Sequence, residues 1–126
     1  MMKIISAFLF FLLLINSSQV FSSNFETKEV KWSDLRKLNY KTGEMPESLR
    51  QLIGKSIKIP GFAVPLEGDD GFEYIDEFLL VPYFGACIHV PPPPPNQVIH
   101  VILDEPVHFE VISFAIWITG IFGIGD

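Results

Sequence analysis

Five consecutive prolines, Pro91 to Pro95, constrain the fold of this chain more than any other feature of its sequence. Each proline fixes φ near −65° and lacks a backbone N–H, so the run cannot form a central strand of a sheet. It must lie close to polyproline II and extend roughly 15 Å, at about 3.1 Å per residue. We expect either a stiff wall that protects a sheet edge or an exposed ridge that docks in an aromatic groove of a partner.

Apolar and β-branched residues on both sides of the prolines predict a sheet. Residues 78–90 ("FLLVPYFGACIHV") predict one long bent strand, or two strands with a bend at Gly85. Residues 97–103 ("QVIHVIL") predict a strand that returns beside it. Two further strands are predicted at 55–67, with a bulge or bend at Gly61, and at 114–122, and a turn is predicted at 104–106.

Short helical stretches are expected only near the start of the chain, at 31–38 and 46–54, with Trp32 as a core anchor. The strand-rich remainder favours a mainly β fold. We expect a small OB-like five-stranded barrel with a short N-terminal helical segment, and a small β-sandwich is the alternative. Residues 23–126 are long enough for a single small domain with a modest core.

Residues 1–22 are typical of a secretory signal peptide. A basic start at Lys3 precedes an apolar stretch from Ile4 to Ile15 and then a polar region that ends at Ser22. The apolar stretch is about a dozen residues, too short for a comfortable membrane span of roughly 20. We therefore expect cleavage after Ser22 and export to the periplasm of a Gram-negative bacterium, with membrane contact only if this segment stays uncleaved.

The charge balance limits the partners. A formal net charge of −6 makes the chain a poor partner for nucleic acid, whose phosphates need lysine and arginine. The acidic stretch 68–77 lacks the ligand spacing of a calcium loop and predicts a solvated hairpin loop instead.

Cys87 is the only cysteine, so the chain has no internal disulfide. His89 follows two residues later, and residues two apart in an extended segment point to the same face. A thiolate and an imidazole together can bind a soft metal, with zinc or copper(I) as the natural choices. The alternative to metal binding is that Cys87 and His89 are buried together and have only a structural role.

His100 can complete such a site if it lies beside His89 on the returning strand. Pairing of residue 89 with residue 100 would place both imidazoles on one face, and a slip of one residue would separate them. The candidate metal ligands are therefore Cys87, His89 and His100.

A thiol-dependent enzyme is a weaker hypothesis. It needs an activated thiol, an oriented base and an oxyanion site. Asn96, Asp104 or Glu110 could orient a histidine, but the spacing selects none of them, and no CxxC motif is present. We rank binding above catalysis.

The block "VPYFGACIHVPPPPPNQ" resembles the hallmark motif of the bacterial domain-of-unknown-function 3299 family, and the similarity extends over roughly Trp32 to Gly120. Its motif positions in this sequence are Cys87, His89, Asn96, Gln97 and the prolines Pro91, Pro92, Pro93, Pro94 and Pro95. The resemblance implies an exported Gram-negative protein whose relatives often carry a lipid anchor and continue beyond the last strand. We therefore expect a truncated or shifted C-terminus here.

The resemblance also implies an association with ABC-type export systems, sometimes in zinc-responsive gene clusters, and no established activity. Our first hypothesis is thus a periplasmic accessory or binding protein of an envelope ABC-type permease or another periplasmic protein, with transition-metal binding through the Cys-x-His motif. The alternatives are a structural protein-binding module that uses the polyproline ridge, and the thiol enzyme.

Overall fold

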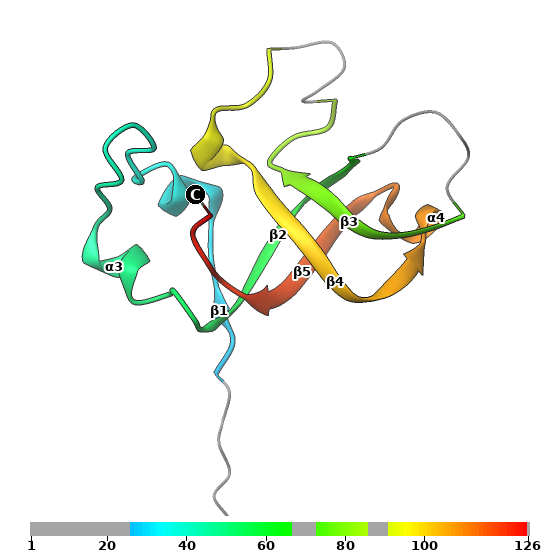
Figure 1. The fold of residues 1–126 in the computed structure, drawn as a ribbon, viewed down its shortest axis with the longest axis horizontal. Coiled ribbons are helices and arrows are strands. Elements are labelled where there is room, and N and C mark those ends of the chain that lie inside the picture. The colour runs from blue at the N-terminus through cyan, green and yellow to red at the C-terminus, as the bar shows by residue number, and fades with distance from the viewer. Residues whose placement is uncertain (1–25, 67–72, 86–90, 126) are drawn as a thin grey trace, which may run out of the picture.

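The structure, a computed structural model, describes residues 26–66, 73–85 and 91–125. In these parts of the chain, five strands form one sheet that curls into a half-barrel, with three short α-helices and one 3-10 turn around it (Figure 1). The elements are β1 (Lys28–Glu29), α2 (Trp32–Leu35), α3 (Glu47–Arg50), β2 (Ser56–Pro65), β3 (Tyr74–Val81), η1 (Pro95–Gln97), β4 (Ile99–His108), α4 (Phe109–Ile112) and β5 (Ala115–Ile121). This confirms the predicted mainly β, barrel-like fold with a short N-terminal helical segment.

β2 is the centre of the sheet. Its residues Ser56 to Phe62 pair antiparallel with β5 along one edge. Along its other edge, β1 pairs in parallel near Ile57 and β3 pairs antiparallel from Phe62 onward. β2 therefore pairs with three strands. The sheet must bend at the point along β2 where its partner on this edge changes from β1 to β3.

Gly61 lies at this bend, where sequence reasoning places a bulge or bend. A Cβ at Gly61 would lie 2.8 Å from Leu80 Cγ and 2.8 Å from the carbonyl oxygen of Val81. Real Cβ atoms do not approach so closely, so only glycine lets β3 pack against β2 here.

β3 and β4 form an antiparallel pair with an interruption. Leu79 pairs with His100, and Glu77 pairs with Ile102, but Ile75 pairs with Val107. The extra residues of β4 therefore bulge out of the ladder opposite β3. The turn predicted at 104–106 is wrong, because β4 continues through these residues to His108. Residues 104–106 belong to the bulge in β4.

One cluster of buried apolar side chains forms the core of the described domain. It combines apolar side chains of β2, β3 and β4 with residues from α2, α3 and the segments beside them: Val30, Leu35, Leu49, Leu52, Ile57, Ile59, Ile75, Phe78, Leu80, Val101, Ile112 and Phe122. Trp32 packs against this cluster, as predicted for a core anchor. Its indole Nε1 also donates a 2.6 Å hydrogen bond to the carbonyl of Pro60, which ties α2 to β2.

The hairpin loop predicted over 68–77 is wrong for its last four residues, because β3 begins at Tyr74. Two small elements also differ from the sequence expectation. β1 lies in the polar stretch 23–30, which shows no strand pattern, because a two-residue strand needs only backbone pairing with β2. α4 is a single helical turn whose cap is His108, and it was not predicted either. No helix in the described parts of the chain is long and apolar enough to cross a membrane.

Candidate functional site

The connection between β3 and β4 contains the motif that sequence analysis singles out. β3 ends at Val81 and Pro82 follows, so the long strand predicted over 78–90 is confirmed only up to this proline. Gly85 adopts a positive φ of 76°, which agrees with the predicted bend there. Cys87 and His89 lie outside the described residues, and their predicted proximity stays a prediction.

The start of this connection exposes two aromatic side chains. Tyr83 is 42% exposed and Phe84 is 79% exposed. The Phe84 ring stands edge-on to Phe62, with ring centroids 6.0 Å apart. An apolar surface therefore lies where the chain leaves the sheet.

The proline run, which we name the proline ridge (Pro91–Pro95), has one buried and several exposed members. Pro93 is buried, while Pro91, Pro92, Pro94 and Pro95 are exposed. Pro94 has φ −65° and ψ 158°, close to polyproline II. A polyproline II helix has three residues per turn, so Pro93 faces the domain while the prolines on either side of it face outward. The ridge thus has an inner side and two outer sides.

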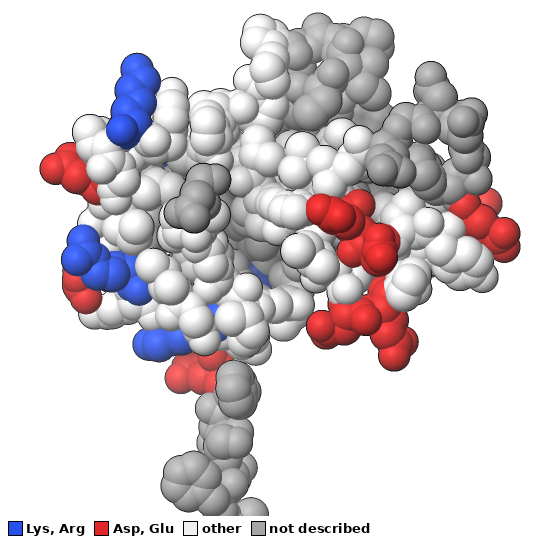
Figure 2. All heavy atoms as spheres, viewed as in Figure 1, with Lys and Arg blue, Asp and Glu red and all other residues white. Residues whose placement is uncertain are grey.

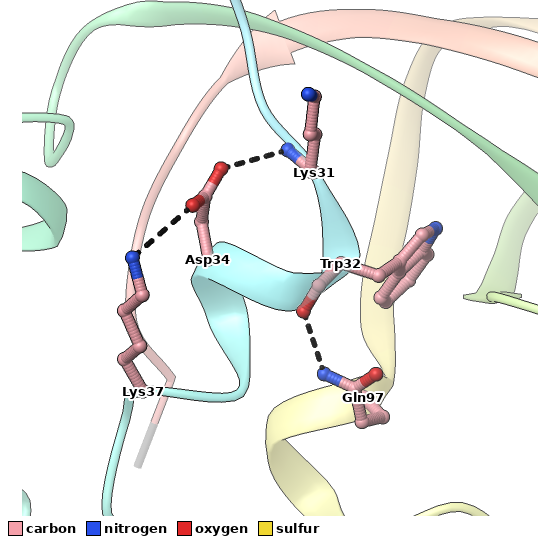
Figure 3. A network of polar contacts seen from close by, with 5 residues as sticks. All are labelled: Lys31, Trp32, Asp34, Lys37 and Gln97. Atoms are coloured by element: carbon pink, nitrogen blue, oxygen red, sulfur yellow. Dashed lines mark hydrogen bonds and ion pairs between the residues drawn. The ribbon is translucent and has the colours of Figure 1, made fainter.

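Gln97 anchors the end of the ridge to α2. Its side chain is 5% exposed, and its Nε2 donates to the carbonyl of Trp32 at 3.0 Å and to that of Asn96 at 2.7 Å. Figure 3 shows the amide pointing at the carbonyl of Trp32. Its Oε1 accepts a longer hydrogen bond, 3.4 Å, from Nε of Arg36.

Asn96 makes a second attachment to the end of α2. Its Nδ2 donates to the carbonyl of Arg36 at 3.2 Å and to that of Leu38 at 2.9 Å. The last carbonyls of a helix have no partner inside the helix, and here amide side chains satisfy them. The Oδ1 atom of Asn96 is buried and accepts no hydrogen bond from the described residues, so this side chain acts through its donors.

α2 itself is fixed from its other end. The Asp34 carboxylate accepts a 3.2 Å hydrogen bond from the backbone N–H of Lys31 and lies 3.4 Å from Nζ of Lys37 (Figure 3). The hydrogen bond from Lys31 is the main reason that the pKa of Asp34 lies below its ordinary value. The helix that receives Asn96 and Gln97 is therefore capped at its start and held to β2 by Trp32.

A cavity of about 600 Å³ lies beside these anchors. Its walls come from α2 and the turn after it, from the end of the ridge and the start of β4, and from the C-terminal segment: Leu35, Leu38, Tyr40, Gly43, Pro95, Asn96, Val98, Ile99, His100, Phe122, Gly123, Ile124 and Gly125. Figure 1 shows the C-terminus beside α2. The lining is largely apolar, with the Asn96 side chain and His100 as its main polar groups.

His100 lies on the outer face of the sheet, because its neighbour Val101 points into the core. Its Nε2 pairs with the carboxylate of Glu77, and both side chains are about half exposed. The ladder pairs His100 with Leu79, so β3 is its strand partner. The structure therefore presents this imidazole to solvent beside a carboxylate.

The described ranges contain no group of three or more histidine, cysteine or acidic side chains that could hold a metal. The Cys87–His89–His100 set is not tested by this result, because two of its members lie outside those ranges. The three side chains proposed to orient a histidine lie on three different elements. The Asn96 side chain donates a hydrogen bond to the carbonyl of Arg36 at the end of α2. Asp104 is exposed on β4, and Glu110 is exposed on α4.

Charge is divided between two sides of the domain. Every lysine and arginine of the described chain lies at or before Lys58, whereas acidic residues continue through β3, β4 and α4. Figure 2 shows the basic side chains on the side of the domain that holds α3 and β1, where acidic side chains lie among them, and only acidic side chains over β4 and α4. The sequence shows this division, but its placement on opposite sides of one surface needs the fold.

Sequence reasoning identified Asn96 and Gln97 as motif residues but missed what they bind. Their partners are backbone carbonyls some 60 positions earlier in the chain, at Trp32, Arg36 and Leu38. Carbonyl groups leave no signal in a sequence. The pairing of Glu77 with His100 was missed as well, because it depends on the strand register.

Comparison with known proteins gives two matches. A family model described as a protein of unknown function, DUF3299, matches residues 16–126. A crystal structure of a DUF3299 family protein from Pseudomonas aeruginosa PAO1 is similar at 32% sequence identity with a TM-score of 0.56, over 75% of this chain and 79% of that chain. No curated protein matches the chain. Neither matching description states an activity.

Proposed function

The chain belongs to the DUF3299 family, and we propose that it is a protein-binding accessory of the bacterial cell envelope whose working surface is the proline ridge. The observation that carries the proposal is the anchoring of the ridge. Asn96 and Gln97 fix its end to α2, while four of its five prolines stay exposed. A ridge of this kind binds with little loss of conformational entropy, because its backbone is ordered beforehand.

The partner that fits such a ridge has an aromatic-lined groove on an extracytoplasmic surface. An envelope ABC-type permease or another periplasmic protein meets this description. The exposed rings of Tyr83 and Phe84 at the other end of the β3–β4 connection add apolar area to the same connection. We propose export by the N-terminal segment, with cleavage after Ser22, as the route to that compartment.

A ridge variant tests this function. Pro91, Pro92, Pro94 and Pro95 are replaced together by alanine, and Pro93 is kept because it is buried. The matched control is Pro106→Ala, an exposed proline on β4. The full chain, tagged and expressed in its host envelope, should co-purify with the same envelope protein in the parent and the control, and lose it in the ridge variant. Equal recovery in all three would contradict the proposal.

Transition-metal binding through Cys87, His89 and His100 is the second candidate. The exposed position of the His100 imidazole beside the Glu77 carboxylate favours it, because an accessible imidazole with a carboxylate neighbour suits zinc or copper. A carboxylate beside a ligating histidine also orients its ring and raises its basicity.

Zinc titration of the purified full chain tests the metal candidate. We expect micromolar binding that protects Cys87 from alkylation, and loss of both effects in Cys87→Ser and His100→Ala. His108→Ala is the matched control, since His108 caps α4 and lies at the far end of β4 from His100. Absence of micromolar binding, or equal binding by all variants, would reject the metal site and leave the ridge proposal standing.

A further inference from the structure

We infer that the free edge of β5 is a self-association surface, at which two copies of this chain pair their β5 strands antiparallel around a two-fold axis. β5 pairs with β2 only, and no described strand covers its other edge. An uncovered strand edge presents a row of backbone donors and acceptors that another strand can satisfy.

The outward-pointing backbone groups follow from the hydrogen bonds at the end of β5. The N–H of Phe122 donates to the carbonyl of Lys55 at 3.0 Å, and the carbonyl of Phe122 accepts from the N–H of Gly54 at 2.8 Å. Both groups of Phe122 thus point toward the β2 side. Along a strand of an antiparallel ladder, the backbone N–H and C=O groups of successive residues point alternately to one edge and to the other. The backbone groups of the odd-numbered residues from Ala115 to Ile121 therefore point to the free edge.

The side chains of the same alternate residues form an uncharged outer row that includes two large apolar side chains. Trp117 is 51% exposed and Ile121 is 65% exposed, and β5 contains no charged residue. Lys58 of the neighbouring strand lies 4.6 Å from the centre of the Trp117 ring. Natural proteins usually protect such an edge with lysine, proline or a bulge, and β5 has none of these.

The opposite edge of the sheet has that protection. β4 contains Asp104, Glu105 and Pro106, and its ladder with β3 is interrupted at the same place. Pairing β4 with the β4 strand of a second copy would bring acidic side chains close to one another. Pairing β5 with a second β5 brings no charged side chains together, because β5 has none. Charge therefore selects β5 as the strand that meets its own copy.

The best register places Ile118 on the two-fold axis. Trp117 then faces Thr119 of the second copy, and Ala115 faces Ile121 of the second copy. This register uses the whole of β5, Ala115–Ile121, and every facing pair of odd-numbered residues exchanges hydrogen bonds. A large ring lies against a β-branched side chain in the central pairs, which is a favourable cross-strand combination.

The test compares oligomeric states of the purified full chain by light scattering across a dilution series. Thr119→Pro removes an outward N–H in each copy, and an edge strand tolerates proline at such a position. By symmetry two hydrogen bonds are lost. At about fivefold for each bond, we expect the dissociation constant of the dimer to rise about 25-fold. Ile121→Lys places a charge on the edge and should also yield monomers.

Ile102→Lys is the matched control, because Ile102 is 73% exposed on β4, away from the β5 edge. It should dimerise like the parent, and circular dichroism checks that every variant is folded. A monomeric parent, a larger open-ended assembly, or an equal effect of Ile102→Lys would overturn the inference. Dimers that persist in both Thr119→Pro and Ile121→Lys, as association through the apolar residues 4–15 would give, would overturn it too. Capture of a foreign strand in place of a second copy would appear as a parent without a second copy of the chain.

Cross-linking tests the register. In a Cys87→Ser background, Ala115→Cys with Ile121→Cys should form disulfides between copies, since hydrogen-bonded partners lie about 5.5 Å apart at Cα. Within one chain the two positions are about 20 Å apart along the strand and cannot bridge. Ala115→Cys alone should not cross-link. A covalent dimer from the single variant, or none from the double variant, would refute this register.

Discussion

Replacement of Gln97 by alanine should detach the proline ridge from α2 and destabilise the fold. Nε2 of Gln97 makes two short hydrogen bonds to carbonyls, and the side chain is 5% exposed. Each net hydrogen bond is worth about 1 kcal/mol, and the small cavity left by the side chain adds to this. The long contact with the exposed Arg36 contributes little. We expect a loss of about 2–3 kcal/mol in the free energy of unfolding.

Urea denaturation and thermal melting measure this loss. For a domain of this size each kcal/mol shifts the midpoint by about 4–8 °C, so a shift of roughly 10–20 °C is expected. Gln51→Ala is the matched control, because Gln51 is exposed and makes only a 3.4 Å hydrogen bond to Glu47. It should cost less than about 0.5 kcal/mol.

Gln97→Glu sharpens the same experiment. It keeps the shape of the side chain but replaces the donor with a carboxylate oxygen that faces the carbonyls of Trp32 and Asn96. At neutral pH it should destabilise at least as much as Gln97→Ala, and protonation at low pH should restore part of the loss because a carboxylic acid can donate. The reasoning is refuted if Gln97→Ala and Gln51→Ala cost the same within about 0.5 kcal/mol.

Three further predictions concern the framework that supports the ridge. Gly61→Ala should cost about 1–3 kcal/mol in urea denaturation, because its Cβ would meet Leu80 and Val81, whereas Gly120→Ala, with open space around it, should cost less. Trp32→Phe should cost about 1 kcal/mol by loss of the hydrogen bond to Pro60, and a midpoint unchanged from the parent would contradict that bond. The lowered pKa of Asp34 stabilises the fold above its ordinary value of 3.8, and this contribution disappears as the pH falls through the lower folded value. Asp34→Asn should therefore narrow the gap between melting midpoints at pH 6 and pH 3, by a small amount because the Asp34 side chain is 42% exposed, and an unchanged gap would count against the Lys31–Asp34 hydrogen bond.

Local pattern predicts much of this fold because local geometry determines it. Alternation identifies β2, and the apolar run "AIWITGI" identifies β5. The end of β3 at Val81 was not predicted, since the apolar pattern continues past Pro82. The strand β1 and the bulge in β4 were missed, since both depend on partners distant in sequence. Dependence on partners distant in sequence also explains why the contacts of the candidate site were not predicted. The proline ridge is visible in the sequence, but the carbonyls that receive Asn96 and Gln97 and the carboxylate beside His100 become visible only with the strand register.

The central claim is that the anchored proline ridge is the surface that meets a partner. Site-specific photo-cross-linking in living cells tests it most directly, with the photoreactive residue at Pro94 on the ridge or at Pro106 on β4, both exposed. The account predicts one discrete adduct with an envelope protein from position 94, none from position 106, and loss of the adduct when Gln97→Ala is added. No adduct from position 94, or the same adduct from both positions, would contradict the account.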